Sequence, residues 1–304
     1  MIVYHYCSMD VFMKIISGKS IRLSDITKSN DSMEILWITK HIRDVFAEAF
    51  QKECGKTKFF REGCQESEFM DLVEQYSNEF FKQDKRVHSY LVCCFSKKGD
   101  LLSQWRGYAD DAKGVSVGFE DEIIKSLSKP GKDGKDVENP FQYGKAVYSE
   151  SMQKSRIRKC AKKLISELKK IIKLKNVDED EREKKIMDIF YSCFTQLFKL
   201  SIMMKNPFFK EENEYRLSYR IDIKPRNKIT DEYGDKDLHI SGLTYHNSSN
   251  DLIPHIDLMF GSNPQIIKEV IIGPRCRARI EDIEEFLEQN GIHCEVKLSQ
   301  GTYR

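Results

Sequence analysis

The sequence predicts an α+β protein, in which a mixed or split β-sheet has flanking helices and a helical hairpin insertion. Short runs of β-branched and aromatic residues occur towards both ends of the chain, and amphipathic helical patterns lie between them. Residues 151–205 contain no glycine or proline and carry apolar residues at helical spacing. The chain has 304 residues, 40% of them hydrophobic, which suffices for a large core. We expect a single α+β domain over residues 1–304, with the hairpin inserted at 151–205.

The chain begins with a strand–helix–strand pattern. Residues 2–6 and 20–24 are rich in strand-forming side chains. Between them, Ser8 is a suitable N-cap and Gly18 a suitable C-terminal stop for a helix. The apolar face expected for this helix consists of Val11, Phe12, Ile15 and Ile16.

The later elements follow from the same patterns and from glycine, proline and polar interruptions. We expect helices at about 32–49, 66–83 and 280–289, two helices within 151–205 joined by a turn and cap at 177–180, loops at 125–140 and 226–237, and strands at 90–96, 114–120, 212–223, 269–273 and 292–298.

Composition excludes several classes of protein. Lys+Arg 50 against Asp+Glu 48 gives a net charge of +2, so a nucleic-acid or anionic-membrane partner would need a local basic patch. The chain has neither a signal-peptide pattern nor a run of eighteen apolar residues, so we expect a cytoplasmic protein that does not enter a membrane. Nine cysteines without zinc spacing predict free thiols and no bound metal.

The most informative polar pattern lies on the strand expected at 212–223. Read in steps of two, one face carries Glu212, Glu214 and Arg216, and the other carries apolar and aromatic residues. A carboxylate and a guanidinium would then stand about 7 Å apart on the same face, at about 3.4 Å per residue. Such a face can bind a small polar ligand, or it can be an ordinary surface ion pair.

Two further candidates lie near the N-terminus. His5, at the end of the first strand, can donate to a ligand hydroxyl, or it can be satisfied by the backbone. Asn30 and Asp31, with Glu34, can line the mouth of a pocket where a helix begins, or they can simply cap that helix.

A third candidate lies between the strands expected at 90–96 and 114–120. Trp105 and Tyr108 around Arg106 form a suitable site for a flat ring and a phosphate group. The alternative is a packed loop, in which Trp105 belongs to the core and Arg106 pairs with Asp110 or Asp111.

Taken together, these short motifs and several others resemble those of the bacterial family catalogued as domain of unknown function 2971. The similarity extends from residue 4 to about residue 276, and it rests on the order and spacing of the motifs. They are Tyr4-His5-Tyr6-x-Ser8, Leu23-Ser24-Asp25, Asn30-Asp31-x-x-Glu34, Cys94-Phe95-Ser96, Trp105-x-x-Tyr108-Ala109-Asp110, Gly114-Val115-x-x-Gly118-Phe119, Glu212-x-Glu214-Tyr215-Arg216 and Glu269-Val270-Ile271-Ile272-Gly273-Pro274.

More distantly, the chain resembles ADP-ribosyltransferases of the His-Tyr-Glu kind, including their DNA-modifying toxin branch. That resemblance implies a split sheet that holds NAD in a cleft. It implies that His5 bonds a ribose of NAD, that Tyr108 or Trp105 stacks on nicotinamide, and that Arg106 or Arg216 faces the pyrophosphate. Glu214, with Glu212 as its competitor, would stabilise the oxocarbenium-like transition state. The middle tyrosine of the family pattern is missing from residues 20–25, and Tyr108 stands in for it.

The expected function is therefore that of an NAD-dependent ADP-ribosyltransferase-like enzyme, a toxin or phage-defence effector that modifies nucleic acid or protein. One alternative is a non-catalytic nucleotide- or protein-binding module of a defence system. In either case the helices of 151–205 could carry a homo-oligomer interface. A second alternative is a metal-dependent nuclease that uses Asp31, Glu34, Glu212 and Glu214. Convergence of His5, Tyr108 and Glu214 on one cleft would favour the transferase.

Overall fold

A computed structural model describes residues 1–28, 33, 35–54, 66–81, 89–128, 139–174, 178–221, 239–248, 250–261 and 263–303. The chain forms two compact units, each assembled from separate stretches of sequence. The sheet unit comprises Met1–Lys28, His88–Ala146 and Lys210–Arg304, and the helical unit comprises Ser29–Val87 and Val147–Phe209. Asn30, Asp31 and Glu34, which were candidates from the sequence, lie outside the described residues.

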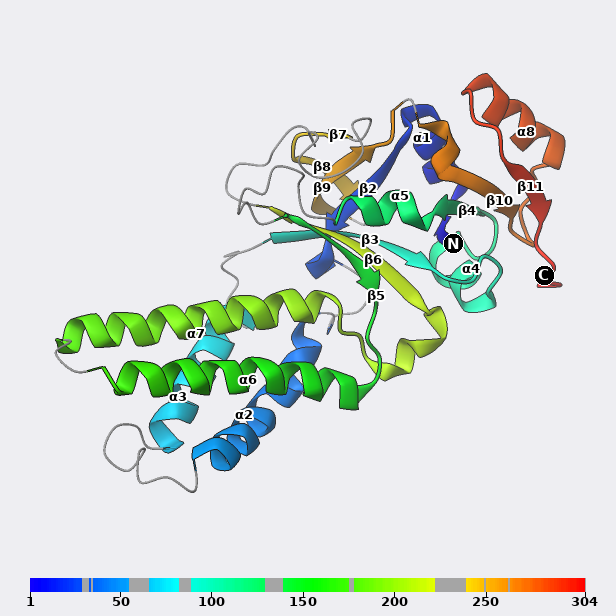
Figure 1. Cartoon of the computed structure of the whole chain (residues 1–304). Helices are drawn as coiled ribbons and strands as arrows, with labels where there is room; N and C mark the ends of the chain where they lie inside the picture. The colour runs from blue at the N-terminus through cyan, green and yellow to red at the C-terminus, as the bar shows by residue number, and fades with distance from the viewer. Residues whose placement is uncertain are drawn as a thin grey trace. The chain divides into compact units, whose positions relative to one another are not determined.

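The described part of the sheet unit contains one mixed, eleven-stranded sheet (Figure 1). Its order is β11-β10-β4-β1-β3-β2-β9-β7, while β6 pairs with β3 and β5, and β8 pairs with β9. β10 and β11 are parallel, and the other pairs are antiparallel. The strands are β1 (Ile2–Cys7), β2 (Ser20–Asp25), β3 (Ser89–Ser96), β4 (Val115–Glu120), β5 (Phe141–Lys145), β6 (Glu214–Ile221), β7 (His239–Ile240), β8 (Thr244–Ser248), β9 (Asp251–Met259), β10 (Ile267–Ile272) and β11 (Glu295–Leu298).

Short helices flank this sheet, which confirms an α+β protein with a mixed open sheet. They are α1 (Met9–Gly18), α4 (Leu102–Tyr108), α5 (Asp121–Ser126), α8 (Ile280–Gln289) and the 3-10 helices η1 (Ile26–Lys28), η4 (Pro207–Glu212, of which Lys210–Glu212 belong to this unit) and η5 (Pro264–Ile266). α1 begins and ends as the sequence indicates: the Ser8 side chain accepts from the Val11 amide, and the helix ends at Gly18. Val11, expected on the buried face, is 40% exposed.

The two faces of the sheet differ in chemistry because side chains alternate along each strand. In β1, Val3 and Cys7 enter a large apolar core that also receives residues of α1, α5 and α8. Tyr6 points to the opposite face, where Trp105 of α4 and Ile271 of β10 pack with it. The polar side chains of β6 lie on the same face of the sheet as Tyr6.

β1 and β2 lie along the same edge of β3, each beside a different stretch of it. β6 pairs with β3 over its whole length on the other edge. On the shared edge, β2 pairs with Leu91 and Val92, whereas β1 pairs only with Ser96. The His5 ring lies between these two stretches, with Nδ1 3.0 Å from the Cys94 carbonyl oxygen. A side chain thus satisfies a backbone acceptor in this stretch of β3.

The helical unit brings together helices from two distant stretches of sequence: η2 (Leu36–Ile38), α2 (Thr39–Cys54), α3 (Glu66–Phe81), α6 (Glu150–Ile172) and α7 (Glu179–Ile202). α6 packs on α7 and α2, and α3 packs on α2 and α7. Asp178 caps α7 through the Glu181 amide, at the turn predicted from the sequence. Phe46, Phe69 and Phe194 form the aromatic centre of this packing. No described helix is long and apolar enough to cross a membrane.

Candidate functional site

The strand that carries the best sequence candidates starts later than expected. Glu212 is the last residue of η4, and Asn213 adopts a left-handed backbone with φ of 47°. β6 therefore begins at Glu214. The expectation that Glu212 and Glu214 alternate along one strand is wrong, because a turn at Asn213, a residue type that tolerates this conformation, separates them.

Glu214 and Arg216 form a buried, bidentate ion pair. Arg216 donates from Nε to Glu214 Oε1 at 2.9 Å and from Nη2 to Oε2 at 3.1 Å. The side chains are 1% and 5% exposed, so the pair is not the surface ion pair considered from the sequence. Burial of two charges is tolerated only when each compensates the other, and this geometry does so.

Glu212 is tied to two distant segments. The Tyr108 hydroxyl, from the end of α4, donates to Glu212 Oε1 at 3.3 Å. The Ser96 hydroxyl, at the end of β3, donates to the Glu212 carbonyl at 2.8 Å, and Ser96 lies opposite Glu214 in the β3–β6 register. We call Ser96, Tyr108, Glu212, Glu214 and Arg216 the carboxylate cluster. Glu212 is buried, while Tyr108 is 41% exposed.

Trp105 and Arg106 have separate roles from Tyr108. Trp105 is buried, donates from Nε1 to Asp100 at 2.6 Å and packs edge-on against Tyr6, which makes it a core residue. Arg106 is exposed, and its guanidinium lies 5.9 Å from the centre of the Tyr303 ring. Neither residue contributes a described contact to the carboxylate cluster.

His5 lies on the other face of the sheet. Tyr4 of β1 is opposite Ser96, and Ser96 is opposite Glu214, so the neighbouring residue His5 faces away from the cluster. Its ring contacts Phe95 edge-on. Burial lowers the pKa of His5 below its ordinary 6.5. A carbonyl can only accept, so Nδ1 donates to Cys94 and Nε2 is left as an acceptor. The structure thus brings together Tyr108, Glu212, Glu214 and Arg216, but not His5.

The residues described by the structure contain no group of three or more His, Cys, Asp or Glu side chains that could hold a metal ion. Two of the four carboxylates that the nuclease alternative requires, Asp31 and Glu34, lie outside those residues.

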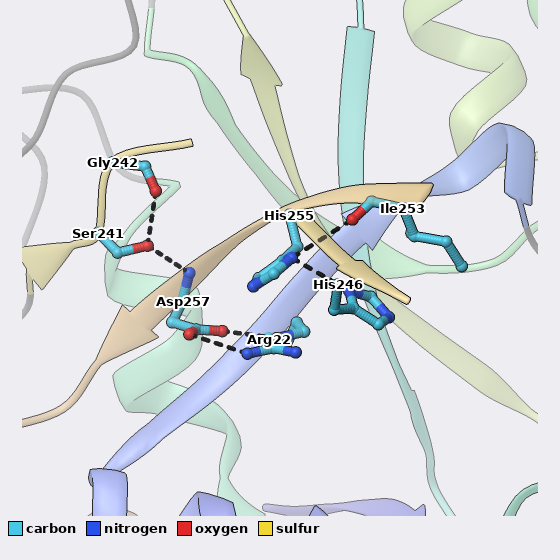
Figure 2. Close-up of polar contacts among 7 residues, drawn as sticks. All are labelled: Arg22, Ser241, Gly242, His246, Ile253, His255 and Asp257. Atoms are coloured by element: carbon cyan, nitrogen blue, oxygen red, sulfur yellow. Dashed lines mark hydrogen bonds and ion pairs between the residues drawn. The ribbon is translucent and has the colours of Figure 1, made fainter. Parts of the chain in front are cut away.

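A second polar group, for which the sequence offered no candidate, lies on β2, β8, β9 and the segment between β7 and β8 (Figure 2). Arg22 donates from Nε to Asp257 Oδ1 at 2.8 Å and from Nη2 to Oδ2 at 3.2 Å. The Asp257 amide donates to the Ser241 hydroxyl at 2.8 Å, and that hydroxyl donates to the Gly242 carbonyl. This bidentate pair is partly exposed, with side-chain exposures of 40% and 27%.

Two histidines adjoin this ion pair. His255 Nδ1 is 3.1 Å from His246 Nδ1 and 3.4 Å from the Ile253 carbonyl, which can only accept. His255 Nδ1 is therefore the donor to both, and His246 Nδ1 accepts. The pKa of both histidines is lowered, mainly by burial and secondly by the positive charge of Arg22. Residues 248–251, between β8 and β9, are of turn-forming types. From this signal in the sequence, the pairing of β8 with β9 could have been predicted.

Residues 104–217 match the model of a family described as "Protein of unknown function (DUF2971)". The matched range begins within α4 and ends within β6, so it contains Tyr108, Glu212, Glu214 and Arg216 but not His5. No curated protein and no solved structure matches the chain. The resemblance to ADP-ribosyltransferases therefore rests on the sequence pattern alone.

Proposed function

We propose that the protein is an NAD-dependent ADP-ribosyltransferase-like enzyme that acts through the carboxylate cluster. The observation that carries the proposal is the hydrogen bond from the half-exposed Tyr108 to Glu212. It joins an aromatic ring to a carboxylate that comes from 104 residues away in the sequence. A ring beside a carboxylate suits a flat leaving group and the positive charge that develops when it departs.

In this proposal Tyr108 stacks on nicotinamide and Glu212 faces the ribose. The bond between ribose C1′ and the nicotinamide nitrogen breaks, and nicotinamide leaves with the bonding electron pair. The carboxylate stabilises the oxocarbenium-like charge on the ribose. An acceptor nucleophile on nucleic acid or protein then bonds to C1′ and releases its proton. As a toxin or phage-defence effector, the enzyme would inactivate its acceptor in this way.

We assign Glu212 this role over Glu214 because both Glu214 oxygens accept from Arg216. Glu214 and Arg216 then act as the rigid support that fixes the start of β6. Arg216 is not assigned to the pyrophosphate, because its guanidinium is 1% exposed and is bound to Glu214.

The test is nicotinamide release from NAD by the purified protein. We expect release by the wild type and at least a tenfold loss in Glu212→Gln, since loss of a group that stabilises transition-state charge commonly costs about 10²-fold or more. Tyr108→Ala, which removes the stacking ring, should also lower release. Glu211→Gln is the matched control, because Glu211 is an exposed neighbour in η4. Equal release by Glu211→Gln and Glu212→Gln would remove Glu212 from the chemistry.

The second candidate is a non-catalytic module that binds a nucleotide or a protein partner. It is favoured by the closed Glu214–Arg216 pair and by the position of His5 on the opposite face. A thermal shift with NAD or ADP-ribose, without any nicotinamide release, would select this candidate over the transferase.

A further inference from the structure

A cationic hollow lies in the sheet unit, outside the carboxylate cluster. It has a volume of about 470 Å³ and is lined by Met9, Lys113, Arg275, Cys276, Arg277 and Ala278. Three of these six residues are cations, and they come from two segments: the turn before β4 and the loop between β10 and α8. Met9 is the first residue of α1, so the positive end of that helix also adjoins the hollow.

The two segments are fastened to each other by backbone hydrogen bonds. The Gly273 amide donates to the Gly114 carbonyl at 3.0 Å, and the Arg275 amide donates to the Ala112 carbonyl at 3.0 Å. The backbones approach so closely that a Cβ added at Gly273 would lie 2.5 Å from the Ala112 oxygen. Rigid walls lower the entropy cost of binding, because they need not be ordered by a ligand.

Part of the positive charge in the hollow is not cancelled by neighbouring carboxylates. Asp111 binds Arg275 in an ion pair and also accepts from the Tyr303 hydroxyl at 2.8 Å, which fixes the Arg275 side chain. Asp110 is 3.9 Å from Lys113, and both side chains are more than half exposed, so this pair is weak. Arg277 is exposed and forms no ion pair with any residue in the described part of the chain.

From this arrangement we propose that the hollow binds a phosphate ester. A phosphate monoester carries close to two negative charges and has three acceptor oxygens, which matches Arg and Lys donors that line one hollow better than a single carboxylate does. The hollow has the volume of a small-molecule site, and Met9 and Ala278 give its wall an apolar part for the organic group. The ester is either a free, nucleotide-sized molecule or the terminal phosphate of a nucleic acid.

The test is a binding titration of the full-length protein with pyrophosphate, AMP, and a short oligonucleotide with or without a 5′-phosphate. Succinate is the carboxylate comparison. We expect AMP to bind and Arg277→Gln to weaken its binding about tenfold, as loss of a charged hydrogen bond does. Lys113→Gln should weaken it by several-fold. A preference for the 5′-phosphorylated oligonucleotide over AMP would identify the nucleic-acid source.

The matched control is Arg279→Gln. Arg279 is an exposed arginine two positions further on, it pairs with Asp282 at 2.6 Å, and it does not line the hollow. Both variants lower the net charge equally, so equal weakening would mean non-specific attraction and would overturn the proposal. Absence of AMP, pyrophosphate and oligonucleotide binding, or equal binding of succinate, would also overturn it. Arg277 lies outside the carboxylate cluster. The outcome of the binding titration is therefore independent of whether the protein releases nicotinamide from NAD through Glu212.

Discussion

Among the bidentate arginine–carboxylate pairs in the described part of the sheet unit, two have the same chemistry and contrasting surroundings. Arg216 and Glu214 lie two residues apart on β6 and are 1% and 5% exposed. Arg22 and Asp257 lie opposite each other on β2 and β9 and are 40% and 27% exposed. At the surface, the attraction between two charges is largely offset by their hydration, so losing one partner costs little. A buried charge that loses its partner cannot be rehydrated, so the loss is costly. Burial, and not bond geometry, therefore separates a structural pair from a surface pair.

The largest expected effect comes from removing one member of the buried pair. Arg216→Met removes the guanidinium that binds both oxygens of the buried Glu214, and we expect the free energy of unfolding to fall by about 3–5 kcal/mol. Urea denaturation followed by circular dichroism measures this. Arg22→Met is the control at the exposed pair. A similar small loss in both variants would show that the difference in burial does not matter energetically.

The second prediction concerns removal of both charges of the buried pair. In Glu214→Leu with Arg216→Met, both charges of the pair are removed together, so the double variant should be more stable than the sum of the single losses predicts. We expect a coupling energy of about 2–3 kcal/mol from a double-mutant cycle of urea unfolding. Additive losses would mean that the two side chains stabilise the strand independently.

The third prediction concerns how pH changes the folding stability through the histidines beside the exposed pair. The folded-state pKa of His255 lies below the ordinary 6.5, because burial and then Arg22 disfavour the charged ring. The unfolded chain therefore binds more protons as the pH falls through 6.5, and folding stability is lost towards lower pH. His246, His5 and His41 are shifted in the same direction. The wild type should become less stable between pH 7.5 and 5.5.

We expect His255→Gln to lose stability less steeply over the same pH range, because one of these histidines is gone. Urea midpoints at several pH values measure the slope. His293→Gln, a substitution at an exposed histidine outside this group, is the matched control. An unchanged slope in His255→Gln would mean that its protonation is not linked to folding.

The smallest effect is expected for the exposed pair itself. Arg22→Met should lower the free energy of unfolding by less than about 1 kcal/mol. Salt should reduce this difference further, since the Debye length falls to about 3 Å at 1 M ionic strength. Unfolding at low and high salt tests this, and a loss that persists in high salt would place Arg22 among the structural residues.

Some of the candidate site could be read from the sequence. The alternation at 214–221 identified Glu214 and Arg216 as neighbours on one face, and the Trp105–Tyr108 motif marked a second segment. The sequence could not show that the Tyr108 hydroxyl meets Glu212, since the two residues are 104 positions apart. It also placed Glu212 on the strand, because it could not show the left-handed turn at Asn213.

What the sequence determined by itself is the local structure. Ser8 and Gly18 bound α1, Asp178 begins α7, and a two-residue period gives β6, because caps and side-chain periodicity act over a few residues. Only the tertiary structure decided which strands pair and which helices share a core. It joined α2 and α3 to α6 and α7, and it turned His5 away from Glu214. These outcomes depend on contacts between distant residues, whose energies are fixed by packing and burial in the folded chain and not by any local pattern.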